Sequence, residues 1–261
     1  MAVGRARLIS GMHMVGTKKS LGQHWLKNRA ILEEIADLAG KGELCVEIGP
    51  GLGFLTSSLL KRFNKVTAVE YDERLAENLP KSFPGKNLEV VKGDILAYDF
   101  TKIDGDYVIA GNIPYYITSP ILEKVLSTEH LAKKVVLLMQ KEVAERILSE
   151  KETGLSLFVK NRAFVTAGPV VEKAEFTPPP KVDSQVLILE PHAPEVPDEV
   201  FKLIRQSFSS PRKKLIHNLA GLKSKEELAK IFDEIGVSLD ARPGDLHLQD
   251  YQKLCDIISV C

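Results

Sequence analysis

The chain has no excess of charge of either sign, few cysteines and no long apolar run. Its 261 residues include only three cysteines, Cys45, Cys255 and Cys261, and their spacing is not that of metal ligands. No apolar stretch approaches the roughly 20 residues that span a bilayer, and no N-terminal segment has the pattern of a secretory signal. We therefore expect a cytoplasmic protein that holds no metal and has no membrane partner.

The charge is balanced, with 35 Lys and Arg residues against 35 Asp and Glu residues. This balance argues mildly against nucleic-acid binding, because phosphate contacts need positive charge. The distribution points the other way, since residues 1–32 and 201–218 contain basic residues and no acid. Such segments predict either one basic patch or two solvated faces, and charge alone favours the second. The candidate nucleic-acid contacts among them are Lys18, Lys19, Arg212, Lys213 and Lys214.

Hydrophobic patterning divides the chain into three parts. Residues 1–17 show no periodicity and indicate a disordered or tag-like extension. Strands and helices alternate over residues 18–191, which predicts an α/β domain with a mostly parallel, doubly wound sheet. The strands are expected at 43–48, 65–69, 87–91, 106–111, 133–139, 155–165 and 184–190, and the helices at 28–39, up to 62, 117–126 and 141–149. No helix pattern separates the last two strands, so we expect an antiparallel hairpin at the sheet edge.

The remainder of the chain is helical in pattern. A proline-rich linker covers 191–197, and helical patterns follow at 198–209, 212–220, 224–235 and 247–258. This predicts a small all-helical second domain over residues 198–261.

Polar residues follow four successive predicted strands. The first strand runs into Glu47-Ile-Gly-Pro-Gly-Leu-Gly, a tight glycine turn whose third glycine does not match a dinucleotide fingerprint. Glu70 ends the second strand, about twenty residues past the glycines, where an acid can accept hydrogen bonds from ribose hydroxyls. Asp94 follows the third strand and can accept a hydrogen bond from an adenine amino group. The acids suit a nucleoside that carries positive charge better than a diphosphate.

The fourth strand ends in Asn112-Ile-Pro-Tyr, which suits chemistry on an exocyclic amine. The amine is a poor nucleophile because its lone pair is delocalised into the ring. The Asn112 amide oxygen and a backbone carbonyl can accept its two hydrogens and so direct the lone pair at an electrophile. The Tyr115 ring can stack on the base. Further along, Phe176 precedes three prolines that would hold it rigidly.

Each of these features also has a purely structural interpretation that implies no functional site. A carboxylate at a strand end can cap a helix or be solvated, a tetrapeptide can be an ordinary turn, and a proline-rich segment can be a stiff loop. Together they favour a site, because the carboxyl ends of adjacent strands meet in one crevice.

The whole pattern resembles the S-adenosylmethionine-dependent methyltransferases, and more closely the rRNA adenine dimethyltransferases of the KsgA type, which act on the small subunit. The motifs that carry this resemblance are Lys19-Ser-Leu-Gly-Gln-His-Trp-Leu, Glu47-Ile-Gly-Pro-Gly-Leu-Gly, Val69-Glu-Tyr-Asp, Gly93-Asp, Gly111-Asn-Ile-Pro-Tyr, Met139-Gln-Lys-Glu-Val, Phe176-Thr-Pro-Pro-Pro-Lys-Val-Asp-Ser and Arg212-Lys-Lys. They span residues 18–261 and are highly specific in combination. The chain departs from the usual pattern at Trp25, where Phe is usual, at Thr153, where Tyr is common, and in a helical domain that is not strongly basic.

The resemblance implies a Rossmann-like methyltransferase fold and S-adenosylmethionine as cofactor. The implied cofactor-binding residues are His24, Leu26, Gly49, Gly51, Glu70, Asp94, Ile95 and Asn112. The implied catalytic residues around the target base are Asn112, Pro114, Tyr115 and Phe176. The basic candidates named above become expected RNA contacts.

The implied reaction is dimethylation of two adjacent adenosines in the 3′-terminal hairpin of small-subunit rRNA, by a monomer acting on immature small subunits without a DNA partner. Three alternatives stay open. One is a large-subunit rRNA methylase of the macrolide-resistance type, although the Phe176 and Arg212 motifs favour the small-subunit group. Another is a non-enzymatic assembly or transcription factor on the same fold. The third is a DNA adenine methylase, which usually has a second proline where this chain has Ile113.

Overall fold

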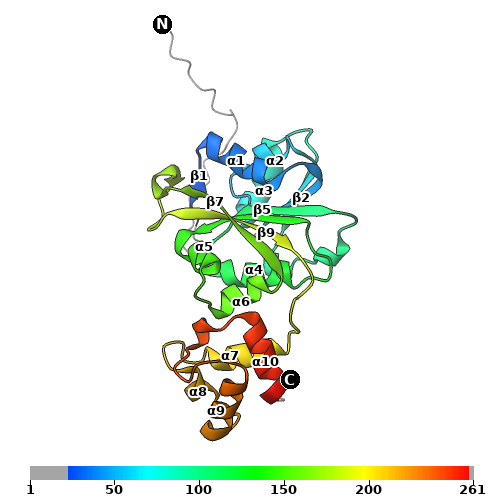
Figure 1. The fold of residues 1–261 in the computed structure, drawn as a ribbon. Coiled ribbons are helices and arrows are strands. Elements are labelled where there is room, and N and C mark those ends of the chain that lie inside the picture. Colours follow the sequence, from blue (N-terminus) through cyan, green and yellow to red (C-terminus); the bar gives the residue numbers. More distant parts are fainter. Residues whose placement is uncertain (1–22, 259–261) are drawn as a thin grey trace.

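The computed structural model describes residues 23–258, so the expected extension 1–17 and the candidate contacts Lys18 and Lys19 lie outside the described residues. A seven-stranded sheet in the order β4-β3-β2-β5-β6-β9-β7 is the centre of the fold (Figure 1). Its strands are β2 (Gly42–Ile48), β3 (Phe63–Glu70), β4 (Leu88–Lys92), β5 (Tyr107–Asn112), β6 (Lys134–Gln140), β7 (Ala163–Val171) and β9 (Ser184–Pro191). The first five in this order are parallel, and β9 is antiparallel to both β6 and β7. The predicted α/β sheet with an antiparallel edge hairpin is confirmed.

Helices cover both faces of the sheet. They are α1 (Arg29–Ala39), α2 (Phe54–Leu59), α3 (Glu73–Ser82), α4 (Thr118–Leu126), α5 (Lys141–Leu148) and α6 (Gly154–Lys160). Apolar residues of α1 and α2 form one buried cluster with the sheet, and those of α4, α5 and α6 form another on the opposite face. Local signals explain the predicted boundary of α1, since the Asn28 side chain caps its first turn and Gly40 follows its last residue.

The expected strand over 155–165 is wrong in its first half. The chain forms α6 there and enters β7 only at Ala163. A capping box starts the helix, because Thr153 Oγ1 accepts from the Ser156 amide at 3.0 Å and Ser156 Oγ accepts from the Thr153 amide at 2.6 Å. A short apolar run cannot by itself distinguish a strand from a buried helix. The helix expected up to residue 62 is also shorter, since α2 ends at Leu59 and β3 begins at Phe63.

A second, two-stranded sheet joins distant parts of the chain. Strand β1 (Trp25–Leu26) pairs antiparallel with β8 (Phe176–Thr177), and Leu26 lies opposite Phe176. His24 Nδ1 lies 2.7 Å from the Pro178 carbonyl oxygen, which extends this connection into the proline-rich segment. The segment before α1 is therefore attached to the loop that follows β7.

The last helices pack around their own apolar core below the sheet (Figure 1). They are α7 (Val200–Ser207), α8 (Leu215–Leu219), α9 (Lys225–Glu234) and α10 (Leu248–Ile258). We call residues 198–258 the helical unit. Its α8 is shorter than expected, because Arg212 and Lys213 lie in the turn before it and Lys214 is its N-cap. Within residues 23–258, no helix combines the length and the apolar character needed to cross a membrane.

Candidate active site

A cavity of about 350 Å³ opens at the carboxyl ends of β2, β3, β4 and β5. Its size is in the range of small-molecule sites. Ten residues named from the sequence line it: His24, Leu26, Gly49, Gly51, Glu70, Asp94, Ile95, Asn112, Pro114 and Tyr115. The sheet brings them together because β4, β3, β2 and β5 are neighbours and end at the same edge.

The glycine turn after β2 is tied to Glu70. Both Gly49 and Gly51 have positive φ, and a Cβ on Gly51 would lie 3.2 Å from the Trp25 indole nitrogen. The Gly51 amide donates to Glu70 Oε2 at 3.0 Å, and the Asp72 amide donates to Oε1 at 2.8 Å. Burial raises the pKa of Glu70, and these two amides oppose that rise. The carboxylate is thus held in one orientation at the cavity wall.

Glu47 is a second buried carboxyl group in the cavity wall. Its Oε2 accepts a hydrogen bond from Thr56 Oγ1 at 2.6 Å. Burial raises its pKa from 4.5 to about 8, and the nearby Glu70 contributes to the rise. Glu47 is therefore mainly protonated at neutral pH, and Glu70 is the acid beside it that hydrogen bonds stabilise in the ionised form.

The Asn112 side chain has a defined amide orientation. Its Nδ2 donates to the His24 backbone carbonyl at 3.0 Å. A carbonyl oxygen only accepts hydrogen bonds, so this contact determines which side-chain atom is the nitrogen. No hydrogen bond to Asn112 Oδ1 comes from residues 23–258, so this oxygen is available as an acceptor at the cavity.

Tyr115 is held at both its ring and its hydroxyl. The hydroxyl lies 2.6 Å from Ser184 Oγ on β9, and the ring stacks on His24 with centroids 5.9 Å apart and planes 19° apart. The preceding Pro114 carbonyl accepts from the Ile117 amide at 3.3 Å and keeps a second lone pair. The site therefore presents two oxygen acceptors beside a fixed aromatic ring.

The remaining site residues named from the sequence lie outside the cavity lining. Phe176 is 2% exposed and packs in the apolar cluster of Leu26 and Val186, so its role as an aromatic face for a base stays a prediction. Arg212 and Lys213 are exposed on the helical unit, and Lys214 there pairs with Asp240.

Two tyrosines that sequence reasoning missed lie at the cavity. Tyr71 and Tyr116 are 65% and 60% exposed and contribute to its lining. Each directly follows a predicted site residue, Glu70 or Tyr115, and this position in the sequence could have indicated that they lie at the cavity. Exposed aromatic rings at a cavity can stack on a flat ring.

Of the side chains that the structure describes, those that line the cavity supply acceptor groups and no lysine or arginine cation. The lining includes Glu47, Glu70 and Asp94. This set of acceptors does not fit a phosphate, but it fits hydroxyl and amine donors and a cationic centre, as in S-adenosylmethionine. Within residues 23–258 no group of three or more histidine, cysteine or acidic side chains is arranged to hold a metal ion.

Comparisons with known proteins identify the family to which the chain belongs. The family model described as "Ribosomal RNA adenine dimethylase" matches residues 14–259. A curated relative from Clostridium acetobutylicum, "Ribosomal RNA small subunit methyltransferase A", is 36% identical over 256 residues, which cover 92% of this chain and 93% of that protein.

Solved structures extend the comparison to the fold. A dimethyladenosine transferase from Plasmodium falciparum superposes with a TM-score of 0.78 at 32% identity, covering 90% of this chain and 98% of that one. The 23S rRNA methyltransferase ErmE superposes with a TM-score of 0.71 at 24% identity, covering 90% and 99%, and shows the shared fold alone. The fold is that of the Rossmann-like methyltransferases, and the chain belongs to the ribosomal RNA adenine dimethylase family.

Proposed function

We propose that this rRNA adenine dimethyltransferase methylates two adjacent adenosines in the 3′-terminal hairpin of small-subunit rRNA, within the immature small subunit and as part of its biogenesis. The observation that carries the proposal is the Asn112 side chain, whose nitrogen is occupied by His24 and whose oxygen is available at the cavity. S-adenosylmethionine, which the family implies, supplies an electrophilic methyl group when bound.

The chain's own residues align the amine. Before the first transfer, Asn112 Oδ1 and the Pro114 carbonyl accept the two hydrogens of the amine, and one of these acceptors holds the single hydrogen that remains before the second. The Tyr115 ring, held by Ser184, stacks on the base. Phe176 would supply the opposite aromatic face after a local rearrangement, because it is buried here. The adenosine must leave its stack to reach the cavity, as for other base-modifying enzymes.

The other end of the cavity suits the adenosine part of the cofactor. Glu70 would accept hydrogen bonds from the ribose hydroxyls, and Asp94 from the adenine amine, beside Ile95. Gly49 and Gly51 would allow close approach of the main chain, and His24 and Leu26 would close the cavity from β1.

One assay separates this proposal from its alternatives. The protein is incubated with tritiated S-adenosylmethionine and, separately, small subunits that lack the modification, large subunits and duplex DNA. We expect label only in small-subunit rRNA, as dimethyladenosine. Label in large subunits or DNA would support the other methylase classes, and no label in any of them would support a non-enzymatic factor.

Glu70→Ala is expected to weaken S-adenosylmethionine binding by roughly 1.5–3 kcal/mol, because it removes a charge-assisted acceptor from the cavity wall. Calorimetric titration measures the effect. Glu77→Ala removes an exposed acid from α3 and is the control. Because Glu70→Ala also frees the Gly51 and Asp72 amides, a thermal melt must first show that the variant is folded. An unchanged dissociation constant contradicts the assignment.

Arg212→Glu combined with Lys213→Glu is expected to weaken small-subunit binding and to flatten its salt dependence, with cofactor affinity unchanged. Both residues are exposed on the helical unit and far in sequence from the cavity. Lys230→Glu with Lys253→Glu makes the same charge change on α9 and α10 and is the control. Equal losses in the two double variants would mean that net charge, rather than this turn, governs RNA binding.

A further inference from the structure

The contact between the sheet domain and the helical unit is built on one short helix, α6. Its Leu157 belongs to the apolar core of the helical unit, and α6 contacts α7. Polar residues at its two ends add contacts to the linker and to the helical unit. We call Glu152, Lys160, Asn161 and Arg162 the α6 joint.

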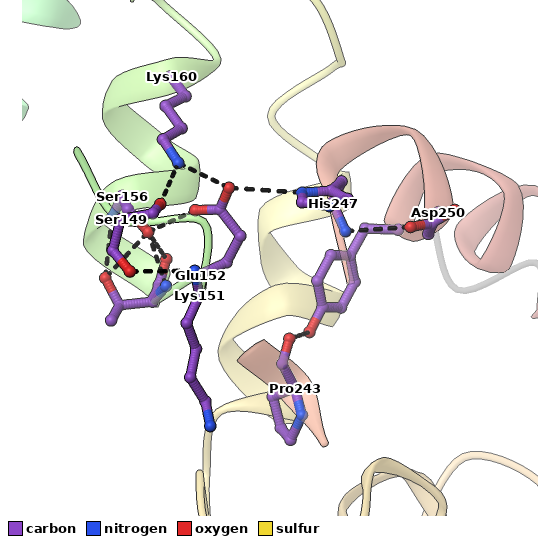
Figure 2. Close-up of polar contacts among 10 residues, drawn as sticks. Ser149, Lys151, Glu152, Ser156, Lys160, Pro243, His247 and Asp250 are labelled. Atoms are coloured by element: carbon purple, nitrogen blue, oxygen red, sulfur yellow. Dashed lines mark hydrogen bonds and ion pairs between the residues drawn. The ribbon is translucent and has the colours of Figure 1, made fainter. Parts of the chain in front are cut away.

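Glu152 is a buried carboxylate shared between the two units (Figure 2). Its side chain is 4% exposed and accepts from Ser156 Oγ at 2.6 Å and Lys160 Nζ at 2.8 Å. His247, which precedes α10, places Nδ1 3.5 Å from the same carboxylate. A buried carboxylate needs such partners, because an unpaired one is costly.

The main chain also makes a close contact at Glu152. The Glu152 amide donates to the Gly244 carbonyl at 3.0 Å. A Cβ on Gly244 would lie only 2.7 Å from the Glu152 carbonyl oxygen, so a larger residue does not fit there without a shift. The turn before α10 is therefore seated directly on the turn before α6.

Asn161 binds the linker through its side chain and main chain. Its Nδ2 donates to the Val196 carbonyl at 3.1 Å, its Oδ1 accepts from the Val196 amide at 2.8 Å, and its own carbonyl accepts from the Glu195 amide at 3.0 Å. Asn161 is fully buried. Residues 191–197 have the composition of a linker, but these hydrogen bonds hold the segment in place against Asn161.

Arg162 reaches the helical unit itself. Its guanidinium lies 4.3 Å from the centroid of the Phe158 ring and 5.3 Å from that of the Phe201 ring on α7, and it forms an ion pair with Asp198. The side chain is buried, and Nη1 has no hydrogen-bond partner among the described residues. Arg162 therefore connects the two units but leaves one buried guanidinium nitrogen, Nη1, without a hydrogen bond among the described residues.

The other side of α6 leads to the active site. Helix α6 contacts α4, which begins at Thr118, directly after the Asn112–Ile117 segment. Thr118 Oγ1 donates to the Tyr115 carbonyl at 3.1 Å. A continuous series of packed elements thus runs from the catalytic tetrapeptide through α4 and α6 to the helical unit.

We propose that the α6 joint fixes the helical unit relative to the cavity, and that Glu152, Arg162 and His247 are positioning residues for RNA methylation. The inference rests on the proposed function in that RNA held by the helical unit must present one adenosine to Asn112. A fixed spacing raises the effective concentration of that adenosine at the cavity, whereas a loose connection lowers it.

The first test measures the spacing directly. Spin labels on p-acetylphenylalanine at Glu129 and Glu226, both exposed, report the distance between the two units by pulsed electron resonance. We expect a single narrow distribution of label-to-label distances for the parent, and a broad distribution for Arg162→Met combined with His247→Ala. Methionine keeps an apolar side chain against the Phe158 and Phe201 rings. His247 is 62% exposed, so its removal leaves no cavity.

Two matched variants sharpen this measurement. Lys133→Ala removes an exposed ion pair with Asp106 inside the sheet domain and should leave the distribution narrow. His247→Gln keeps a polar side chain beside Glu152. With Arg162 intact, we expect it to give a narrower distance distribution than His247→Ala does. If the double variant folds and its distribution stays as narrow as the parent's, the joint does not fix the units and the proposal is wrong. If the double variant does not fold, the comparison of His247→Ala with the parent decides in the same way.

The second test asks whether the spacing matters for methylation. We expect KM for small subunits to rise about tenfold in the double variant, with kcat within about threefold and the S-adenosylmethionine dissociation constant unchanged. A merely destabilised variant would lose active enzyme and hence kcat instead. An unchanged KM alongside a broadened distribution would overturn the positioning role. If the parent does not methylate small subunits, the proposed function fails separately, and the distance measurement still decides whether the joint fixes the units.

Discussion

Asn112→Ala is expected to lower the turnover of adenosine methylation on small subunits on the order of a hundredfold or more, with little change in subunit binding. The variant removes the Oδ1 acceptor that aligns the amine lone pair with the methyl group. Alignment acts mainly in the transition state, and one such contact is typically worth about 3–4 kcal/mol. Single-turnover methylation, read as dimethyladenosine by mass spectrometry, measures the effect.

Asn112→Asp is the sharper variant of the same test. It keeps an acceptor but replaces Nδ2, so that an oxygen faces the His24 carbonyl and a charge is added beside the methyl donor. We expect it to be impaired as well, because the amide orientation is lost. Asn78→Ala removes an asparagine side chain from α3, away from the cavity, and should retain parental turnover. Parental rates in both Asn112 variants would mean that Asn112 does not align the amine.

Glu47→Gln is expected to make the protein without cofactor more stable than the parent as pH rises toward 8. Glu47 keeps its proton in the folded protein up to about pH 8, but loses it near 4.5 when unfolded. Between these values the folded state binds more protons, so the parent's free energy of unfolding falls with rising pH. Glutamine resembles the protonated acid and still accepts from Thr56. The difference should reach on the order of 4 kcal/mol by pH 8.5, measured by urea unfolding.

Glu33→Gln is the matched control for this pH dependence. Lys61 and Arg62 lower the pKa of Glu33 to about 2, so Glu33 is ionised in both folded and unfolded chains above about pH 5.5. Its contribution is lost only as pH falls toward 2, and its substitution should cost a constant amount between pH 5.5 and 8.5. If the Glu47→Gln difference is equally constant over this range, Glu47 is not protonated in the folded protein.

Much of the sheet could be predicted because its signals are local. Two of its strands end at Glu70 and Asn112, and a third ends just before Gly93-Asp94. They are mainly apolar runs followed by a polar residue, and neighbouring parallel strands end at one edge of the sheet. The ten cavity residues followed from that rule and from the resemblance. Helix α6 could not be predicted in this way, because its short apolar sequence is compatible with a strand or a helix. The Thr153–Ser156 capping box, which the structure shows, stabilises the helix.

The sequence by itself indicated most strands of the seven-stranded sheet, the resemblance to the family and ten of the residues that meet at the cavity. Tertiary structure decided how those groups are held. Asn112 is oriented by a carbonyl 88 residues earlier in the chain, Phe176 is buried by its pairing with β1, and Glu152 meets His247 across two units. The physical reason is the sequence separation of the interacting residues. Capping, turns and periodicity depend on residues a few positions apart, whereas these contacts form only after the sheet and the helical unit have packed.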